Sequence, residues 1–186
     1  MRNTWRTLGV VLTLSVAACT GCNNDGGSDG NGNDTEDNIV CTGTYSGGAT
    51  GKVKFCSLSA LKTSDGSLQY TLEIEPDTSG TVVSNDNLTL FAKGDPKKGT
   101  FALDTFTDAV SRMSVQGDKD YELLRANGAQ AGKATLTIET VPSGTNLAGN
   151  NVKYDNFAGK AEIQYVAPQG APYTDTVTLT LSFQRQ

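Results

Sequence analysis

The chain has 186 residues, enough for one domain with a real hydrophobic core, and we expect a single folded unit. Its 20 acidic residues outnumber its 15 basic ones, giving a net charge of −5. This argues against nucleic acid as a partner, because phosphates demand a clustered basic face. Histidine is absent, which excludes Ser-His-Asp and Cys-His nucleophiles, histidine-based zinc sites and the commonest general base.

Residues 1–18 have the layout of a secretory signal peptide. Arg2 and Arg6 make the start positive, residues 7–18 are apolar with small residues at their end, and no acidic residue precedes Asp25. The apolar run is well short of the roughly 20 residues that a helix needs to cross the hydrocarbon core. We therefore expect a cleaved signal and not a durable transmembrane anchor.

The end of this run, Val16-Ala17-Ala18-Cys19, resembles the lipobox of bacterial lipoproteins. In that family a small pair precedes a cysteine whose thiol is diacylglycerylated before cleavage, and only cysteine offers a thiolate nucleophile there. The resemblance covers residues 1–19 and implies that Cys19 becomes the lipid-modified first residue of the mature protein. The two or three acyl chains of the family would attach it to the membrane effectively permanently.

The same resemblance predicts the cellular location of the protein. Thr20 follows the acceptor, whereas the inner-membrane retention signal in many proteobacteria is an aspartate there. We therefore expect the outer membrane, with the protein facing either the periplasm or the exterior.

Two alternatives to lipidation at Cys19 stay open. One is an ordinary secretory signal cut near Ala18. The other is lipidation at Cys22, which would leave an even count of two cysteines but would put Cys19 where the family has an aliphatic residue.

Residues 19–38 form the predicted lipidated cysteine and tether. Residues 20–38 are almost entirely Gly, Asn, Asp, Ser, Thr and Glu, so they bury too little apolar surface to offset their conformational entropy. We expect a disordered linker that spans on the order of 25 Å.

Part of the tether has the oxygen ligands of a calcium loop. Asp29, Asn31 and Asn33 stand at positions one, three and five of an EF-hand-like spacing. Position six is Asp34 where a glycine should turn the chain, and position twelve is Val40 where a bidentate glutamate is needed. We therefore predict no metal site and no cofactor.

Residues 39–186 are predicted to form one all-β domain. Apolar residues alternate with polar ones in four runs, at 68–75, 134–139, 161–165 and 177–183. Further strands are expected at 40–45, 52–58, 81–84, 87–93, 99–105 and 110–115, separated by turn sequences rich in Gly, Asn, Asp and Ser. Residues 121–126 could form a single helical turn at most. The fold class we predict is an antiparallel β-sandwich, with a β-barrel as the alternative.

Cys41 and Cys56 are predicted to form a disulfide. They are equidistant from the midpoint between Gly48 and Ala49, so a symmetric hairpin turning at residues 46–51 places them opposite each other. Opposed Cβ atoms lie about 4.5–5.5 Å apart, which local twist can close to disulfide geometry. Outside the cytoplasm the bond would contribute roughly 3 kcal/mol. The alternative is a pair of small buried thiols.

Two patterns suggest catalysis without sufficient support. Ser59 and Lys62 match the S-x-x-K of serine acyl-enzymes, but the companion signatures K-T-G and S-D-N are absent at 98–100 and 84–86. Glycosidase chemistry needs only two carboxylates at a set separation. Candidates for that pair are Glu73, Glu75, Asp104, Asp108 and Glu162. We expect Glu73 and Glu75 to lie on the solvated face of a strand.

Two further groups could belong to binding surfaces. Aromatic residues near the Gly- and Asn-rich loop 143–151 are expected mainly to pack in the core, with sugar or partner stacking as the alternative: Tyr154, Phe157, Tyr165 and Tyr173. Lys93, Lys97 and Lys98 are expected to form a soluble hairpin end that blocks edge pairing.

The sequence therefore favours a non-catalytic, monomeric envelope module, anchored to the membrane through its N-terminal lipid, that binds a protein or glycan or serves structurally. In layout it resembles the many small predicted bacterial lipoproteins with sandwich-like bodies. The alternatives are a carboxylate-based hydrolase acting on envelope polysaccharide and a calcium-dependent adhesin.

Overall fold

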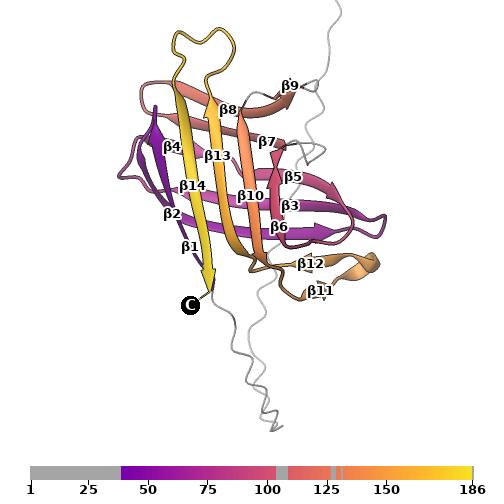
Figure 1. The fold of residues 1–186 in the computed structure, drawn as a ribbon. Coiled ribbons are helices and arrows are strands. Elements are labelled where there is room, and N and C mark those ends of the chain that lie inside the picture. Colours follow the sequence, from indigo (N-terminus) through magenta and orange to yellow (C-terminus); the bar gives the residue numbers. More distant parts are fainter. Residues whose placement is uncertain (1–38, 104–108, 127–128, 131, 186) are drawn as a thin grey trace, which may run out of the picture. The chain divides into compact units, whose positions relative to one another are not determined.

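The computed structural model describes residues 39–103, 109–126, 129–130 and 132–185 (Figure 1). The predicted signal peptide 1–18, the lipid acceptor Cys19 and the tether 19–38 lie outside the described residues. So do Asp104 and Asp108, two of the carboxylates named above.

Nearly all the regular secondary structure of the described residues is β-strand. A 3₁₀ turn, η2, spans Ala148–Asn150. The strands, in chain order, are β1 (Ile39–Gly47), β2 (Gly51–Lys62), β3 (Ser67–Pro76), β4 (Val82–Asn85), β5 (Leu88–Lys93), β6 (Gly99–Ala102), β7 (Ala109–Val115), β8 (Lys119–Ala126), β9 (Ala129–Gln130), β10 (Lys133–Thr140), β11 (Gly144–Asn146), β12 (Val152–Tyr154), β13 (Ala158–Val166) and β14 (Thr176–Arg185).

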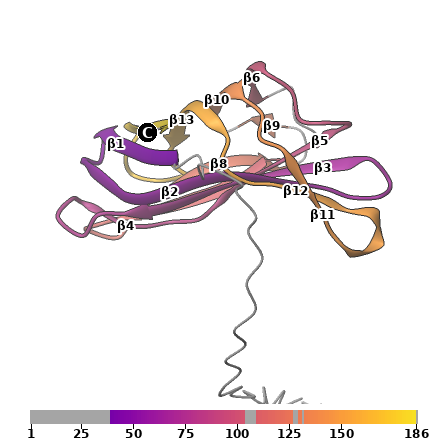
Figure 2. The same ribbon diagram turned by 90° about the horizontal axis from the view of Figure 1, so that it is seen from below.

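These strands make one curled antiparallel sheet in the order β6-β10-β13-β14-β1-β2-β3-β5-β7-β8-β9. Strand β4 pairs with β7, and the β11–β12 hairpin pairs with β2. The sheet curls far enough for β8 to meet β13 at Glu122 and Val166. In Figure 1, β14, β13 and β10 cross in front of β2, β3 and β5, and Figure 2 shows the two groups as opposite sides of the curl.

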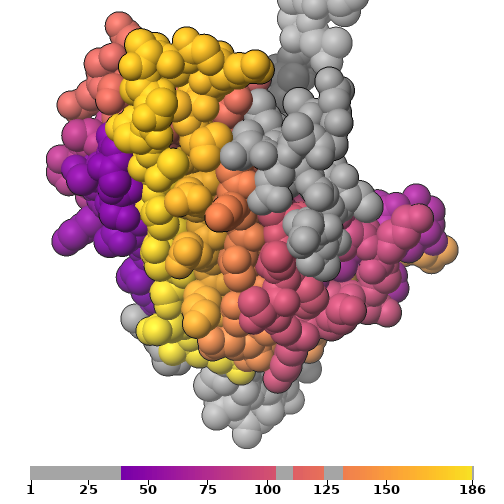
Figure 3. Space-filling view, turned by 45° about the horizontal axis from the view of Figure 1, so that its top comes forward, coloured from indigo at the N-terminus to yellow at the C-terminus, as the bar shows by residue number. Residues whose placement is uncertain are grey.

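The prediction of an all-β antiparallel domain is confirmed. Because the pairing is continuous through β14, β1 and β2, the fold is a half-barrel, and the barrel-like alternative describes it better than two separate sheets. Figure 3 shows β14, β13, β10 and β6 as neighbouring bands on one face of this half-barrel.

The hydrophobic core is built from the apolar residues that alternate with polar ones along the strands. In each of the four predicted runs the inward apolar side chains are at most 8 % exposed, as at Leu72, Leu136, Ile163 and Leu179. Burying one such side chain stabilises the fold by about 1.5–3 kcal/mol. Side chains from both sides of the curl therefore share one hydrophobic interior.

A polar cluster lies within that interior. Asn85 donates a hydrogen bond to the Tyr45 hydroxyl at 3.2 Å and accepts one from the Tyr165 hydroxyl at 3.1 Å. Ser111 lies 3.0 Å from the Tyr165 hydroxyl and donates to the backbone carbonyl of Asp86. Burial raises the pKa of Tyr165, although its bonds to Ser111 and Asn85 oppose the rise. These mutual bonds offset the cost of desolvating the groups.

Two stretches that were not predicted to be strands contain them. Residues 121–126 belong to strand β8, where Tyr121 and Leu123 point inward with no exposed surface. The adjacent Leu123 and Leu124 blur the alternation in the sequence, which hid this strand. Residues 143–151, taken as a loop, contain the short strand β11, which pairs with β12. Three-residue strands are too short to show a period.

The predicted proximity of Cys41 and Cys56 is confirmed: the two sulfurs are at bonding distance and the Cα atoms lie 5.5 Å apart. The hairpin register differs from the predicted one. Thr44 faces Lys52, which centres the turn on Gly48 and, continued along the strands, would place Phe55 opposite Cys41. A bulge between Val53 and Phe55 adds one residue to β2 and brings Cys56 into position.

Candidate binding site

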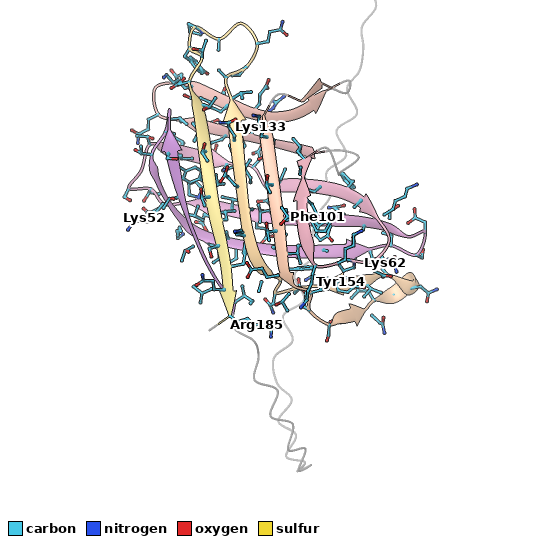
Figure 4. All side chains as sticks on the ribbon, viewed as in Figure 1. Lys52, Lys62, Phe101, Lys133, Tyr154 and Arg185 are labelled. Atoms are coloured by element: carbon cyan, nitrogen blue, oxygen red, sulfur yellow. A yellow bond between two sulfur atoms is a disulfide. The ribbon has the colours of Figure 1, made fainter. Side chains whose placement is uncertain are left out.

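A hollow of about 330 Å³ opens at the end of the sheet where β3 begins and β5 ends. We call it the β5–β6 pocket. Figure 4 shows Phe101, Lys62 and Tyr154 at this end of the fold and Lys52 at the opposite end of β2. The lining residues come from β3, β5, the 94–98 connection and β6: Leu68, Tyr70, Ala92, Lys93, Asp95, Lys97 and Phe101.

The floor of the pocket is apolar and fixed to the core. Leu68 and Tyr70 are 2 % and 4 % exposed, while Ala92 and Phe101 pack partly buried against the core. The Tyr70 ring contacts the buried Phe157 ring edge-on, with centroids 5.9 Å apart. Burial raises the pKa of Tyr70 to about 12, and a hydrogen bond from the backbone N–H of Lys97 opposes that rise. The same bond ties the 94–98 connection to the floor.

The rim of the pocket is positive. Lys62 pairs with Asp95 at 2.5 Å, so the carboxylate among the described lining residues already has a lysine partner. Lys93 and Lys97 are exposed and, in the part of the chain that the structure describes, have no carboxylate within 4 Å. Two uncompensated positive charges therefore stand beside an apolar floor.

The local sequence explains this geometry. Gly94 adopts a positive φ of 89°, and its N–H donates to the Gly66 carbonyl at 2.9 Å, which joins the end of β5 to the turn before β3. Pro96 is buried in the connection. At Gly99, φ is 147° and a β-carbon would lie 3.2 Å from the Phe101 ring, so glycine leaves room for that ring.

The prediction that Lys93, Lys97 and Lys98 form a hairpin end is wrong. Strand β5 pairs with β3 and β7, whereas β6 pairs with β10 on the other side of the curl. The lysines therefore stand on a crossover between the two sides. The hairpin was predicted from three lysines around a Gly-Asp-Pro turn. Nothing in the local sequence showed that apolar residues from β3 and β6 lie beneath these lysines.

The residues considered for catalysis are not brought together. Ser59 and Lys62 are three positions apart on one strand and so face opposite sides of it. Glu73 accepts a hydrogen bond from Ser57 at 2.9 Å, and Glu75 pairs with Lys54. Glu162 is exposed on β13.

The aromatic residues of the last third do not form one surface. Phe157 and Tyr165 are fully buried, as expected for core packing, and Tyr154 packs partly buried against the core near Phe157. At the other end of the sheet, the Tyr173 hydroxyl bonds both the N–H and the carbonyl of Asp120, at 2.9 and 2.8 Å. Tyr173 thus fastens the connection between β13 and β14 to β8.

A second hollow, of about 410 Å³, lies over β4, β7 and β8. Its lining combines Arg112 with the carboxylates Asp86, Asp120 and Glu122, and its larger apolar side chains are Tyr121 and Pro168. Ser114 already donates to Asp120 at 2.6 Å.

Among the described residues, no group of three or more His, Cys, Asp or Glu side chains is arranged to hold a metal ion. In the same part of the chain, no helix combines the length and apolar character needed to cross a bilayer. No family model, no curated protein and no solved structure matches this chain.

Proposed function

We propose that this protein is a lipid-anchored lipoprotein of the bacterial cell envelope whose β domain binds a ligand without catalysing a reaction. The observation that carries the proposal is the sequence Val16-Ala17-Ala18-Cys19 at the end of a signal-like segment. The Cys41–Cys56 pair supports it, because disulfides persist in oxidising compartments such as the periplasm and cell surface.

The β5–β6 pocket supports binding over catalysis. Its polar groups are two lysines and an aspartate held by Lys62, which can attract and orient a ligand. The alternative proposal, a carboxylate-based hydrolase acting on envelope polysaccharide, would need a second carboxylate beside Asp95, and the described lining residues include none.

Metabolic labelling of the full chain in a bacterial host tests the anchor. We expect radiolabelled palmitate to enter the wild-type protein and the Cys22→Ala control, and to be absent from Cys19→Ala. Mass spectrometry of the processed protein should find Cys19 as its acylated first residue, and fractionation should recover it with the outer membrane. Label retained in Cys19→Ala but lost in Cys22→Ala would move the anchor to Cys22, and an unacylated wild-type protein would overturn the proposal.

A further inference from the structure

The β5–β6 pocket combines two properties that together define a class of ligand. We propose that it binds a small organic anion with an apolar body, such as an aromatic carboxylate, with the negative group between Lys93 and Lys97. This inference rests on the binding function proposed above and specifies the chemistry of the ligand.

The charge of the ligand follows from the rim. Lys93 and Lys97 line the same hollow, and neither has a carboxylate within 4 Å among the described residues. Asp95 would otherwise be their nearest counterion in the lining, but Lys62 already holds it at 2.5 Å. An anion entering the pocket therefore meets positive charge without displacing an existing partner of Lys93 or Lys97.

The apolar residues in the floor of the pocket indicate that the ligand has an apolar body. Leu68, Tyr70, Ala92 and Phe101 offer apolar and aromatic surface on one side of the hollow. A volume of about 330 Å³ is near the lower end of the roughly 300–1,000 Å³ typical of small-molecule sites. The pocket therefore suits one small molecule with an apolar face.

The pocket is also built before any ligand arrives. The backbone bond from Lys97 to Tyr70, the bond from Gly94 to Gly66 and the Lys62–Asp95 pair hold the connection in place from three directions. Preorganisation of this kind lowers the ordering cost of binding. Binding should therefore require little rearrangement of the 94–98 connection.

Titration calorimetry with 2-naphthoate tests the inference, using the processed lipoprotein in neutral phosphatidylcholine nanodiscs and empty nanodiscs as the blank. We expect 2-naphthoate to bind, and the double variant Lys93→Gln/Lys97→Gln to bind it about tenfold more weakly. Lys98→Gln, a neighbouring lysine outside the lining, and Lys52→Gln, at the far end of β2, should stay within about twofold of wild type. Far-UV circular dichroism verifies that each variant is folded.

The neutral analogue 2-naphthamide separates the possible failures. We expect it to bind more weakly than naphthoate and to be unaffected by the two lysine substitutions, while Phe101→Ala weakens both compounds. If the amide binds as well as the acid in a Phe101-dependent way, the anionic ligand class is wrong but binding at this pocket stands. If neither compound binds, both the ligand class and the proposed binding site are overturned, while the lipid anchor is judged by acylation alone.

Discussion

At the scale of single residues, two buried tyrosines differ in a way that stability can measure. The Tyr165 hydroxyl bonds Asn85 and Ser111 inside the core. The Tyr121 hydroxyl is equally buried and lies near the Asp175 carboxylate, but it makes no hydrogen bond of good geometry among the described residues. Removing a bonded hydroxyl leaves its partners unsatisfied, whereas removing an unbonded one relieves a desolvation cost.

We therefore expect Tyr165→Phe to lower the free energy of unfolding by about 1–3 kcal/mol. Tyr121→Phe, the matched control, should change it by less than about 0.5 kcal/mol or should stabilise the protein. Urea unfolding followed by circular dichroism measures both values. Equal losses in the two variants would show that the interior polar cluster has no special role.

At the scale of elements, the cysteine pair joins two neighbouring strands, β1 and β2, where their backbone pairing has ended. Strands β1 and β2 pair only at Thr44–Lys52 and Tyr45–Gly51, and the far end of β2 pairs instead with β12. Cys41 and Cys56 join β1 to β2 beyond the last pair of that ladder. The disulfide therefore holds together two strands that backbone bonds no longer join.

Breaking the Cys41–Cys56 bond should lower stability by about 3 kcal/mol. In Cys41→Ala/Cys56→Ala we expect amide hydrogen exchange to accelerate at residues 39–43 and 53–57. Exchange in β7 and β8 should change little under conditions where the protein does not unfold globally. A thiol assay on the native Cys22→Ala protein, with Cys19 acylated as proposed above, should find no free thiol. Two reactive thiols there would refute the disulfide.

Sequence patterns predicted those elements whose two faces differ over at least three alternations. Strands β3, β10, β13 and β14 were found in this way, and the six shorter runs predicted between turn sequences correspond to β1, β2, β4, β5, β6 and β7. The pattern missed β8, because Leu124 follows Leu123, and β11, because it has only three residues. The spacing of the cysteines predicted the correct pair, but the predicted hairpin register was wrong by one residue. The bulge at Lys54 causes the difference, and a bulge of this kind leaves no local signal in the sequence.

At the scale of the whole β domain, curling and the pocket depend on contacts between distant parts of the chain. The pairing of Glu122 with Val166 joins strands far apart in sequence, and no local pattern encodes it. The β5–β6 pocket likewise joins β3, β5 and β6. The sequence showed the lysines of the rim but could not place them over the floor.

The curl also gathers buried tyrosines whose ionisation should make the domain sensitive to alkali. Burial is the first cause that raises the pKa of Tyr70 and of Tyr121 to about 12, and the carboxylate of Asp175 adds to the rise at Tyr121. Burial also raises the pKa of Tyr45, against the opposing bond from Asn85. In the unfolded chain these hydroxyls would ionise near 10.0.

Because the folded pKa is the higher one, the unfolded state releases protons first as the pH rises. The stability that depends on these neutral hydroxyls is complete below pH 10 and is lost as the pH approaches 12. At pH 11, the raised pKa values of Tyr70 and Tyr121 should each lower the free energy of unfolding by roughly 1 kcal/mol relative to neutral pH. The melting temperature should therefore fall steeply between pH 10 and 11 and stay nearly level from pH 8 to 9. In Tyr121→Phe the melting temperature should fall less between pH 10 and 11, because one of the tyrosines that ionise is missing. A melting temperature that stays level up to pH 11 would mean that the folded state does not keep these hydroxyls neutral.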